Sequence, residues 1–82
     1  MARTVKRSEK VIELTPKEFD LLMLLVRNRN IALYRETMFE KVWGEDFEFE
    51  TRTLDLHIQR LRKKLNWKDK IKTVYKIGYM LE

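Results

Sequence analysis

The chain has 82 residues and a formal net charge of +5, and 44% of its residues are hydrophobic. It has no cysteine and one histidine, which excludes disulfides and thiolate or histidine-clustered metal sites, so no cofactor is expected. The apolar runs are far shorter than the roughly 20 residues of a membrane span. The basic N-terminus lacks the apolar segment of a secretory signal, so the expected compartment is the cytoplasm.

The first third of the chain predicts a β-hairpin followed by a helix. Residues 3–7 and 11–14 contain β-branched side chains and flank a short polar connection, as two paired strands do. Thr15 can cap the next helix, Pro16 suits its first position, and Glu18 can complete a capping box. The interior of this helix is apolar on nearly every side, so it is expected at the centre of the core.

Two further helices are expected after the first. Residues 35–43 carry a short apolar face, and residues 52–65 repeat apolar side chains at helical spacing. Asparagine and glycine tolerate the left-handed conformation in which helices end. The candidates for such helix ends are Asn28, Asn30, Gly44 and Asn66.

The C-terminal residues predict a second hairpin. Residues 71–75 and 79–81 are expected to be strands joined around Lys76-Ile77-Gly78. Because glycine adopts left-handed backbone angles at little cost, Gly78 is expected to supply the positive φ that the turn needs.

These elements combine into one expected α+β domain over residues 1–82. A short hairpin in residues 1–14 precedes a three-helix core in residues 15–66, and a β-hairpin wing in residues 67–82 closes the domain. Three helices followed by such a hairpin form a winged helix-turn-helix.

Charge is strongly segregated along the chain. Residues 52–72 hold eight lysines and arginines against two aspartates, whereas residues 36–50 hold six carboxylates against one lysine. We therefore expect a basic face that binds a polyanion and an acidic face that points away from it.

The helix at residues 52–65, RTLDLHIQRLRKKL, divides into two faces. The apolar stripe consists of Leu54, Ile58, Leu61 and Leu65. The opposite side carries Arg52, Thr53, Leu56, Gln59, Arg60 and Lys63. This pattern is typical of a helix that packs on a domain with one face and lies in a DNA groove with the other.

Four segments together resemble the OmpR/PhoB-type output domain of bacterial response regulators, over residues 11–81. They are LTPKEFDLL at 14–22, Arg35 with Val42-Trp43-Gly44, RTLDLHIQRLRKKL at 52–65 and IKTVYKIGY at 71–79. The chain departs from the family at its start, which offers one hairpin where a four-stranded sheet is usual. It also has Tyr75 where arginine is frequent and Lys76 where glycine is common.

The resemblance implies a bacterial transcription regulator that binds specific double-stranded DNA. Helix 52–65 would enter the major groove, and the wing at 71–81 would reach an adjacent minor groove. The acidic segment at 45–50 would face RNA polymerase. A receiver domain, which these 82 residues do not include, is implied as a further partner; without it, the chain is expected to be a monomer in the absence of DNA.

Base contacts are predicted for Thr53, Leu56 and Arg60. Arginine can bond guanine O6 and N7 with both arms of its fork, and the resemblance points to the same position. Leu56 either meets a thymine methyl group or packs on the wing or the preceding loop. The predicted phosphate contacts are Trp43, Arg52, His57, Gln59, Arg62, Lys63, Thr73 and Tyr79. The predicted minor-groove residues of the wing are Lys72, Tyr75 and Lys76.

Some residues have more than one interpretation. Asp55 can favour the helix dipole, accept a bond from cytosine N4, or orient a neighbouring arginine. Tyr79 suits the core or a backbone anchor better than a base-stacking platform. In the acidic segment, one phenylalanine can pack on the core while the other meets a partner. The predicted protein-partner residues are Glu45, Asp46, Phe47, Glu48, Phe49 and Glu50.

No catalytic constellation is found in the sequence, so an enzyme is not expected. The serious alternative to DNA binding is a protein-interaction module, which would use the basic helix or the acidic EDFEFE segment at 45–50.

Overall fold

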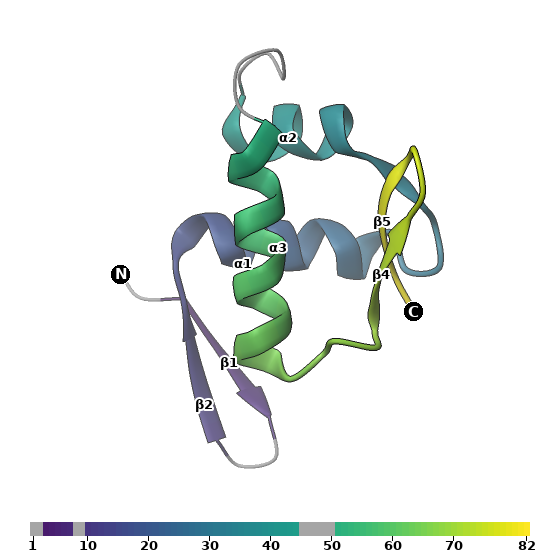
Figure 1. The fold of residues 1–82 in the computed structure, drawn as a ribbon. Coiled ribbons are helices and arrows are strands. Elements are labelled where there is room, and N and C mark those ends of the chain that lie inside the picture. Colours follow the sequence, from purple (N-terminus) through teal and green to yellow (C-terminus); the bar gives the residue numbers. More distant parts are fainter. Residues whose placement is uncertain (1–2, 8–9, 45–50) are drawn as a thin grey trace.

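The computed structural model describes residues 3–7, 10–44 and 51–82, and Figure 1 shows their arrangement. Helix α3 crosses in front of α1, with α2 at one end of α3, and the two groups of strands lie on opposite sides of the helices. Within the described residues, no helix has both the length and the apolar character needed to cross a membrane. The elements are β1 (Arg3–Arg7), β2 (Lys10–Leu14), α1 (Pro16–Arg27), β3 (Leu33–Tyr34), α2 (Arg35–Trp43), α3 (Thr51–Leu65), β4 (Ile71–Val74) and β5 (Gly78–Leu81).

The predicted hairpin and helix start are confirmed. Strands β1 and β2 pair antiparallel, with Val5 opposite Ile12. At the start of α1, the Thr15 hydroxyl accepts the N–H of Glu18 at 3.2 Å, and the Glu18 carboxylate accepts the N–H of Thr15 at 2.9 Å. This reciprocal capping box satisfies two backbone donors that the first turn of a helix would otherwise leave unpaired.

Three of the four candidate helix ends adopt the left-handed conformation. The φ angles are +66° at Asn30, +72° at Gly44 and +54° at Asn66. The prediction for Asn28 is wrong, because this residue caps α1 with a φ of −117°. Its side-chain amide donates to the carbonyl of Leu24 at 2.9 Å, and the left-handed residue follows two positions later, at Asn30.

The C-terminal hairpin belongs to a three-stranded antiparallel sheet in the order β3-β5-β4. Strand β5 is central: Tyr79 pairs with Thr73 on one side and with Leu33 on the other. Strand β3 has only two residues and was not expected from the sequence. Strand β4 ends at Val74, one residue before the predicted end, because the turn begins at Tyr75.

The prediction that Gly78 supplies the positive φ of the wing turn is wrong. Lys76 takes that conformation, with a φ of +62°. Gly78 is needed for close approach instead, since a Cβ atom there would lie 2.1 Å from the carbonyl oxygen of Leu33 and 3.0 Å from the amide nitrogen of Arg35. The requirement for glycine comes from strand β3, which is distant in sequence.

The core forms where α3 packs on α1 and α2. The predicted stripe of α3, namely Leu54, Ile58, Leu61 and Leu65, is fully buried. Helix α1 contributes Leu21, Leu22 and Leu25, and α2 contributes Met38 and Phe39. Ile71, Tyr79 and Leu81 join this cluster from the sheet, so the wing strands are anchored in the same core as the helices.

Among the residues that the structure describes, the carboxylate of Glu18 is buried in this core. Glu18 is fully buried, and its Oε1 accepts the ammonium group of Lys64 on α3 at 2.6 Å. Burial disfavours the charged form, but the hydrogen bonds from Lys64 and Thr15, with the positive charges nearby, hold the pKa of Glu18 below its ordinary value of 4.5. The pair therefore links α1 to α3 through a charge that is held in the ionised state.

We expect Gly78→Ala to destabilise the fold by about 2–4 kcal/mol, because β5 must move away from β3 to accept the new methyl group. The midpoint of urea unfolding measures this change. Lys76→Ala is the control in the same hairpin, since its side chain is exposed; a similarly large loss there would contradict the close-approach argument.

We expect the stability contributed by Glu18 to depend on pH. A carboxyl group whose pKa is lowered by folding stabilises the native state above its unfolded pKa, near 4.5, and this stabilisation is lost as the pH falls through the lower folded value. Glu18→Gln keeps the cap but removes the charge. It should cost about 1–3 kcal/mol at pH 7, and the free energy of unfolding should then fall less steeply below pH 4.5. Parallel acid profiles for the two proteins would refute this assignment.

Candidate nucleic-acid interface

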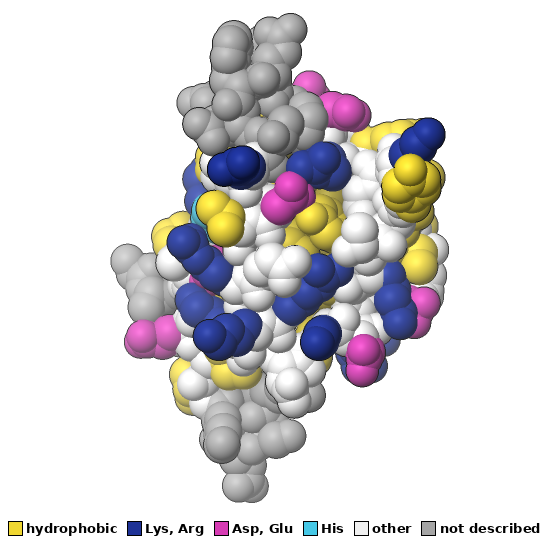
Figure 2. Space-filling view, viewed as in Figure 1, with side chains coloured by type: hydrophobic (Ala, Val, Ile, Leu, Met, Phe, Trp, Pro, Cys, Tyr) yellow, Lys and Arg dark blue, Asp and Glu magenta, His cyan; other side chains and the backbone are white. Residues whose placement is uncertain are grey.

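The outward side of α3 is an exposed and mainly cationic surface. Figure 2 shows lysine and arginine side chains gathered over this helix and around it. The exposed members of this surface are Arg52, Leu56, Gln59, Arg60 and Lys63. Because the opposite stripe of α3 is fully buried, the rotation of the helix about its own axis is fixed and these side chains must face outward.

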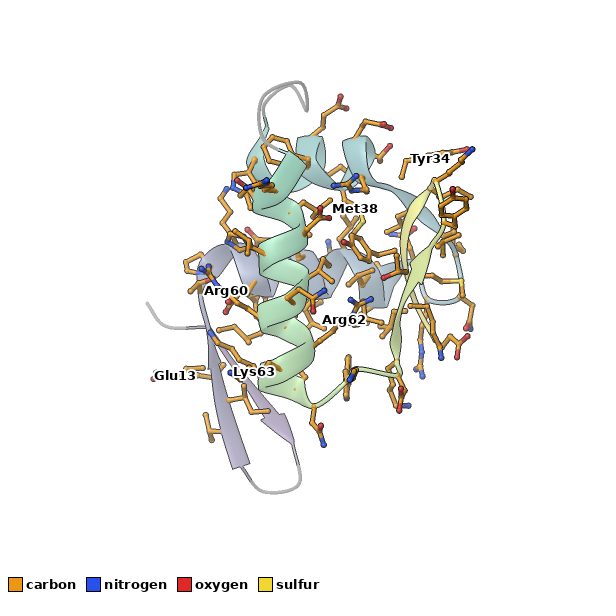
Figure 3. All side chains as sticks on the ribbon, in the orientation of Figure 1. Glu13, Tyr34, Met38, Arg60, Arg62 and Lys63 are labelled. Atoms are coloured by element: carbon orange, nitrogen blue, oxygen red, sulfur yellow. The ribbon has the colours of Figure 1, made fainter. Side chains whose placement is uncertain are left out.

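The three predicted base-contact residues lie on this side or on its flank. Arg60 is exposed and projects from one flank of α3, away from the wing (Figure 3). Leu56 keeps 54% of its surface exposed, so an apolar contact group stands among the charges. Thr53 is half-buried near the start of the helix.

Aromatic packing supports the first turns of α3. His57 Nδ1 lies 2.7 Å from the carbonyl oxygen of Thr53, and since a carbonyl only accepts, Nδ1 carries the proton. The His57 ring meets the Trp43 ring edge-on at 5.0 Å, and Trp43 stacks on Phe39 at 4.9 Å. The predicted phosphate contacts Trp43 and His57 therefore lie together between α2 and α3, while Arg52 is exposed in the first turn of α3.

Asp55 joins three elements. Its Oδ2 accepts the guanidinium of Arg35 from α2 at 2.5 Å, and its Oδ1 accepts the hydroxyl of Tyr79 from β5 at 2.6 Å. Of the interpretations that the sequence left open, the structure supports the one in which Asp55 orients an arginine. Burial of Tyr79, with its hydrogen bond to the negatively charged Asp55, raises the pKa of the tyrosine to about 12.

Arg62 points from α3 to the wing, on the opposite flank from Arg60 (Figure 3). Its Nε and Nη2 donate to the carbonyl oxygen of Ile71 at 3.0 and 2.6 Å, and Nη2 also donates to the Thr73 hydroxyl at 2.8 Å. The phosphate contact of Arg62 stays a prediction. It would use Nη1, because Nε and Nη2 already donate to the wing. The Thr73 hydroxyl keeps its own proton, which it can donate.

Tyr79 is only 6% exposed, as expected for a core residue. Its hydroxyl proton is committed to Asp55, which argues against the predicted phosphate contact. Tyr79 is therefore not carried into the proposed interface.

The tip of the wing is open to solvent. Tyr75 is 83% exposed, and the ammonium group of Lys76 lies over its ring, 5.5 Å from the ring centre. Lys72 is exposed on β4. A crevice of about 340 Å³ separates this tip from the start of α2 and from α3, and Arg35, Asp55 and Tyr79 line it.

The acidic segment at 45–50, with Glu45, Asp46, Phe47, Glu48, Phe49 and Glu50, lies outside the described residues. In the part of the chain that the structure describes, no three histidine, aspartate or glutamate side chains gather to hold a metal ion.

Sequence reasoning missed the role of Arg35 and assigned Arg62 to phosphate alone. The sequence of α3 did contain a sign of these contacts, because Asp55 and Arg62 are seven residues apart and so share one flank of the helix. Opposite charges on the flank between the core stripe and the outward face indicate contact with a neighbouring element. The sequence could not say which element this was.

Comparisons with known proteins agree with this geometry. Residues 8–81 match the family described as "Transcriptional regulatory protein, C terminal". The chain is 50% identical over 76 residues to the uncharacterized transcriptional regulatory protein YclJ of Bacillus subtilis, covering 90% of this chain and 34% of that protein. It is 44% identical to the alkaline phosphatase synthesis transcriptional regulatory protein PhoP of the same species, covering 90% and 32%. The chain thus spans about a third of the length of these relatives.

Solved structures give the same result. The DNA-binding domain of Bacillus subtilis CssR superposes with a TM-score of 0.87 at 34% identity, over the whole of both chains. The DNA-binding domain of Klebsiella pneumoniae RstA, solved in complex with the RstA box, gives a TM-score of 0.87 at 29% identity, covering 96% of this chain and 82% of that one. The chain belongs to the family of OmpR/PhoB-type winged-helix domains that form the C-terminal part of transcriptional regulatory proteins.

Proposed function

We propose that this domain binds a specific double-stranded DNA sequence, with α3 in the major groove and the β4–β5 wing at an adjacent minor groove. The observation that carries the proposal is the division of α3 into a fully buried apolar stripe and an exposed cationic face. The likeness to the RstA DNA-binding domain, which was solved in complex with the RstA box, supports DNA binding by this fold. A protein-interaction module has no comparable support.

Base readout is assigned to Arg60, Leu56 and Thr53. Arg60 is exposed on the outward half of α3, where its guanidinium can reach the edge of a guanine. Leu56 offers an apolar group to a thymine methyl. These two exposed side chains have different chemistry and are about one helical turn apart, so they would read neighbouring base pairs.

Phosphate contacts would position the helix around these base contacts. Arg52, Gln59 and Lys63 are exposed along α3, and cations and amides at the rim of a groove fix the register of a protein on DNA. Trp43, His57 and Thr73 lie at the two edges of this surface. The cations in the last turn of α3 also interact favourably with the helix dipole.

The wing would bind mainly through charge. A narrow minor groove has an enhanced negative potential that attracts cations, and Lys76 stands exposed at the tip of the turn, with Lys72 on the strand before it. Tyr75, held under the ammonium group of Lys76, would pack along the sugar–phosphate edge.

The wider role rests on the resemblance. In a longer regulator, a receiver domain would control this DNA-binding domain, and the acidic segment at 45–50 would contact RNA polymerase. The proposed compartment is the cytoplasm, where a bacterial transcription regulator acts. The isolated domain would be a monomer and would assemble only on DNA.

We expect Arg60→Ala to weaken binding to the preferred site by about 1–3 kcal/mol and to relax preference at one base pair. Lys63→Ala should instead weaken binding to all sequences alike and reduce the slope of log affinity against log salt by about one unit. Selection from a random DNA pool, followed by salt titrations of both variants, measures these effects. If Arg60→Ala behaved like Lys63→Ala, the base contact would be disproved.

We expect Lys76→Ala to weaken binding about fivefold and to flatten any preference for A·T-rich flanks, leaving the major-groove consensus unchanged. Lys41→Ala is the matched control, because this exposed lysine lies on α2 outside the proposed interface and its loss changes the net charge equally. Equal effects of the two substitutions would show that the wing acts only through the overall charge.

A further inference from the structure

Two charged side chains on one flank of α3 hold the wing. Asp55 and Arg62 are seven residues apart, which is about two helical turns, so both face the β4–β5 hairpin. Asp55 accepts the hydroxyl of Tyr79 at 2.6 Å. Arg62 donates to the carbonyl oxygen of Ile71 and to the hydroxyl of Thr73. The hairpin is thus fixed to α3 at two points along the helix axis.

Tyr79 contacts both of these side chains, Asp55 and Arg62. Its hydroxyl bonds Asp55, while the guanidinium of Arg62 lies over its ring, 5.5 Å from the ring centre. The second carboxylate oxygen of Asp55 receives Arg35 from α2. One buried tyrosine therefore connects the central strand of the sheet with α3 directly and with α2 through Asp55.

The hydrogen bonds of Asp55 and Arg62 are directional, whereas apolar packing is not. A hydrophobic contact allows a hairpin to slide or tilt at small cost, whereas hydrogen bonds to charged groups weaken steeply when their geometry changes. Arg62 donates three hydrogen bonds to the hairpin and Asp55 accepts one from it, and a further bond from Arg35 joins Asp55 to α2. The tip that carries Lys76 lies on the turn between the two tied strands.

We propose that Asp55 and Arg62 are positioning residues that hold the wing at a fixed angle to α3, so that Lys76 reaches DNA whenever α3 is seated in its groove. This inference rests on the proposed function. A wing ordered before binding adds its contact without a further loss of conformational entropy, whereas a loose wing would have to be ordered each time.

The first test needs no DNA. Tyr79→Phe removes one hydroxyl and keeps the ring beneath Arg62. Amide hydrogen exchange of residues 72–80 should become about tenfold faster in this variant, with exchange in α1 unchanged. Tyr34→Phe is the matched control, because Tyr34 is 56% exposed on the neighbouring strand β3. Unchanged wing exchange in Tyr79→Phe would overturn the proposal whether or not the domain binds DNA.

The second test is a double-mutant cycle on a labelled duplex that carries the sequence selected by the wild-type chain from a random pool. Lys76→Ala should weaken binding about fivefold in the wild-type background but by less than about twofold in the Tyr79→Phe background. Arg60→Ala should weaken binding by the same factor in both backgrounds, because α3 stays in place. If Tyr79→Phe only lowered the stability of the domain, it would reduce the folded fraction. Lys76→Ala and Arg60→Ala would then each weaken binding by the same factor as in the wild-type background.

Asp55 supplies an independent check. Asp55→Ala removes the hydrogen bonds from Tyr79 and Arg35 and should abolish the contribution of Lys76 to DNA affinity. Asp55→Asn keeps an acceptor oxygen for Tyr79 and should retain most of that contribution. Full retention of the Lys76 effect in Asp55→Ala, with the protein folded by circular dichroism, would refute the positioning role. If the wild-type chain selected no DNA sequence, the proposed function would fail, and the exchange experiment would still decide whether these ties order the wing.

Discussion

The rotation of α3 about its own axis is the constraint on which the rest of the structure depends. Leu54, Ile58, Leu61 and Leu65 are fully buried, and burial of each side chain is worth about 1.5–3 kcal/mol. Turning the helix by one residue would move it through about 100° and bring charged side chains into the core. No surface interaction could offset that penalty, so the direction of every outward side chain is set by the core.

The same constraint sorts the basic residues of α3 into different roles. Lys64 extends back to the buried carboxylate of Glu18, and Arg62 extends sideways to β4. Their charges are engaged within the fold, whereas Arg52, Arg60 and Lys63 are exposed. The charge available to a polyanion is therefore smaller than the sequence count over residues 52–72 suggests.

Local signals in the sequence predicted most of the fold. The capping box at Thr15 and Glu18, the stripe of α3 and the left-handed ends at Asn30, Gly44 and Asn66 each depend on residues close together in the chain. The sequence did not predict β3, because two residues carry no periodicity. It misjudged Gly78 because the reason for glycine there is the carbonyl of Leu33, 45 residues earlier. Likewise, the partners of Asp55 and Arg62 lie on other elements, and helical spacing shows only the flank that they share.

At the tip of the wing, the left-handed backbone of Lys76 lowers the stability of the fold, while its side chain supplies a positive charge. A residue with a Cβ atom at a φ of +62° carries about 1–2 kcal/mol of backbone strain, which a glycine would relieve. Glycine would also remove the ammonium group from the tip. Asparagine, which tolerates this conformation better than lysine, would remove it too. A substitution at this position can therefore raise the thermal stability of the domain and weaken its attraction to a polyanion, without changing the core or the outward face of α3.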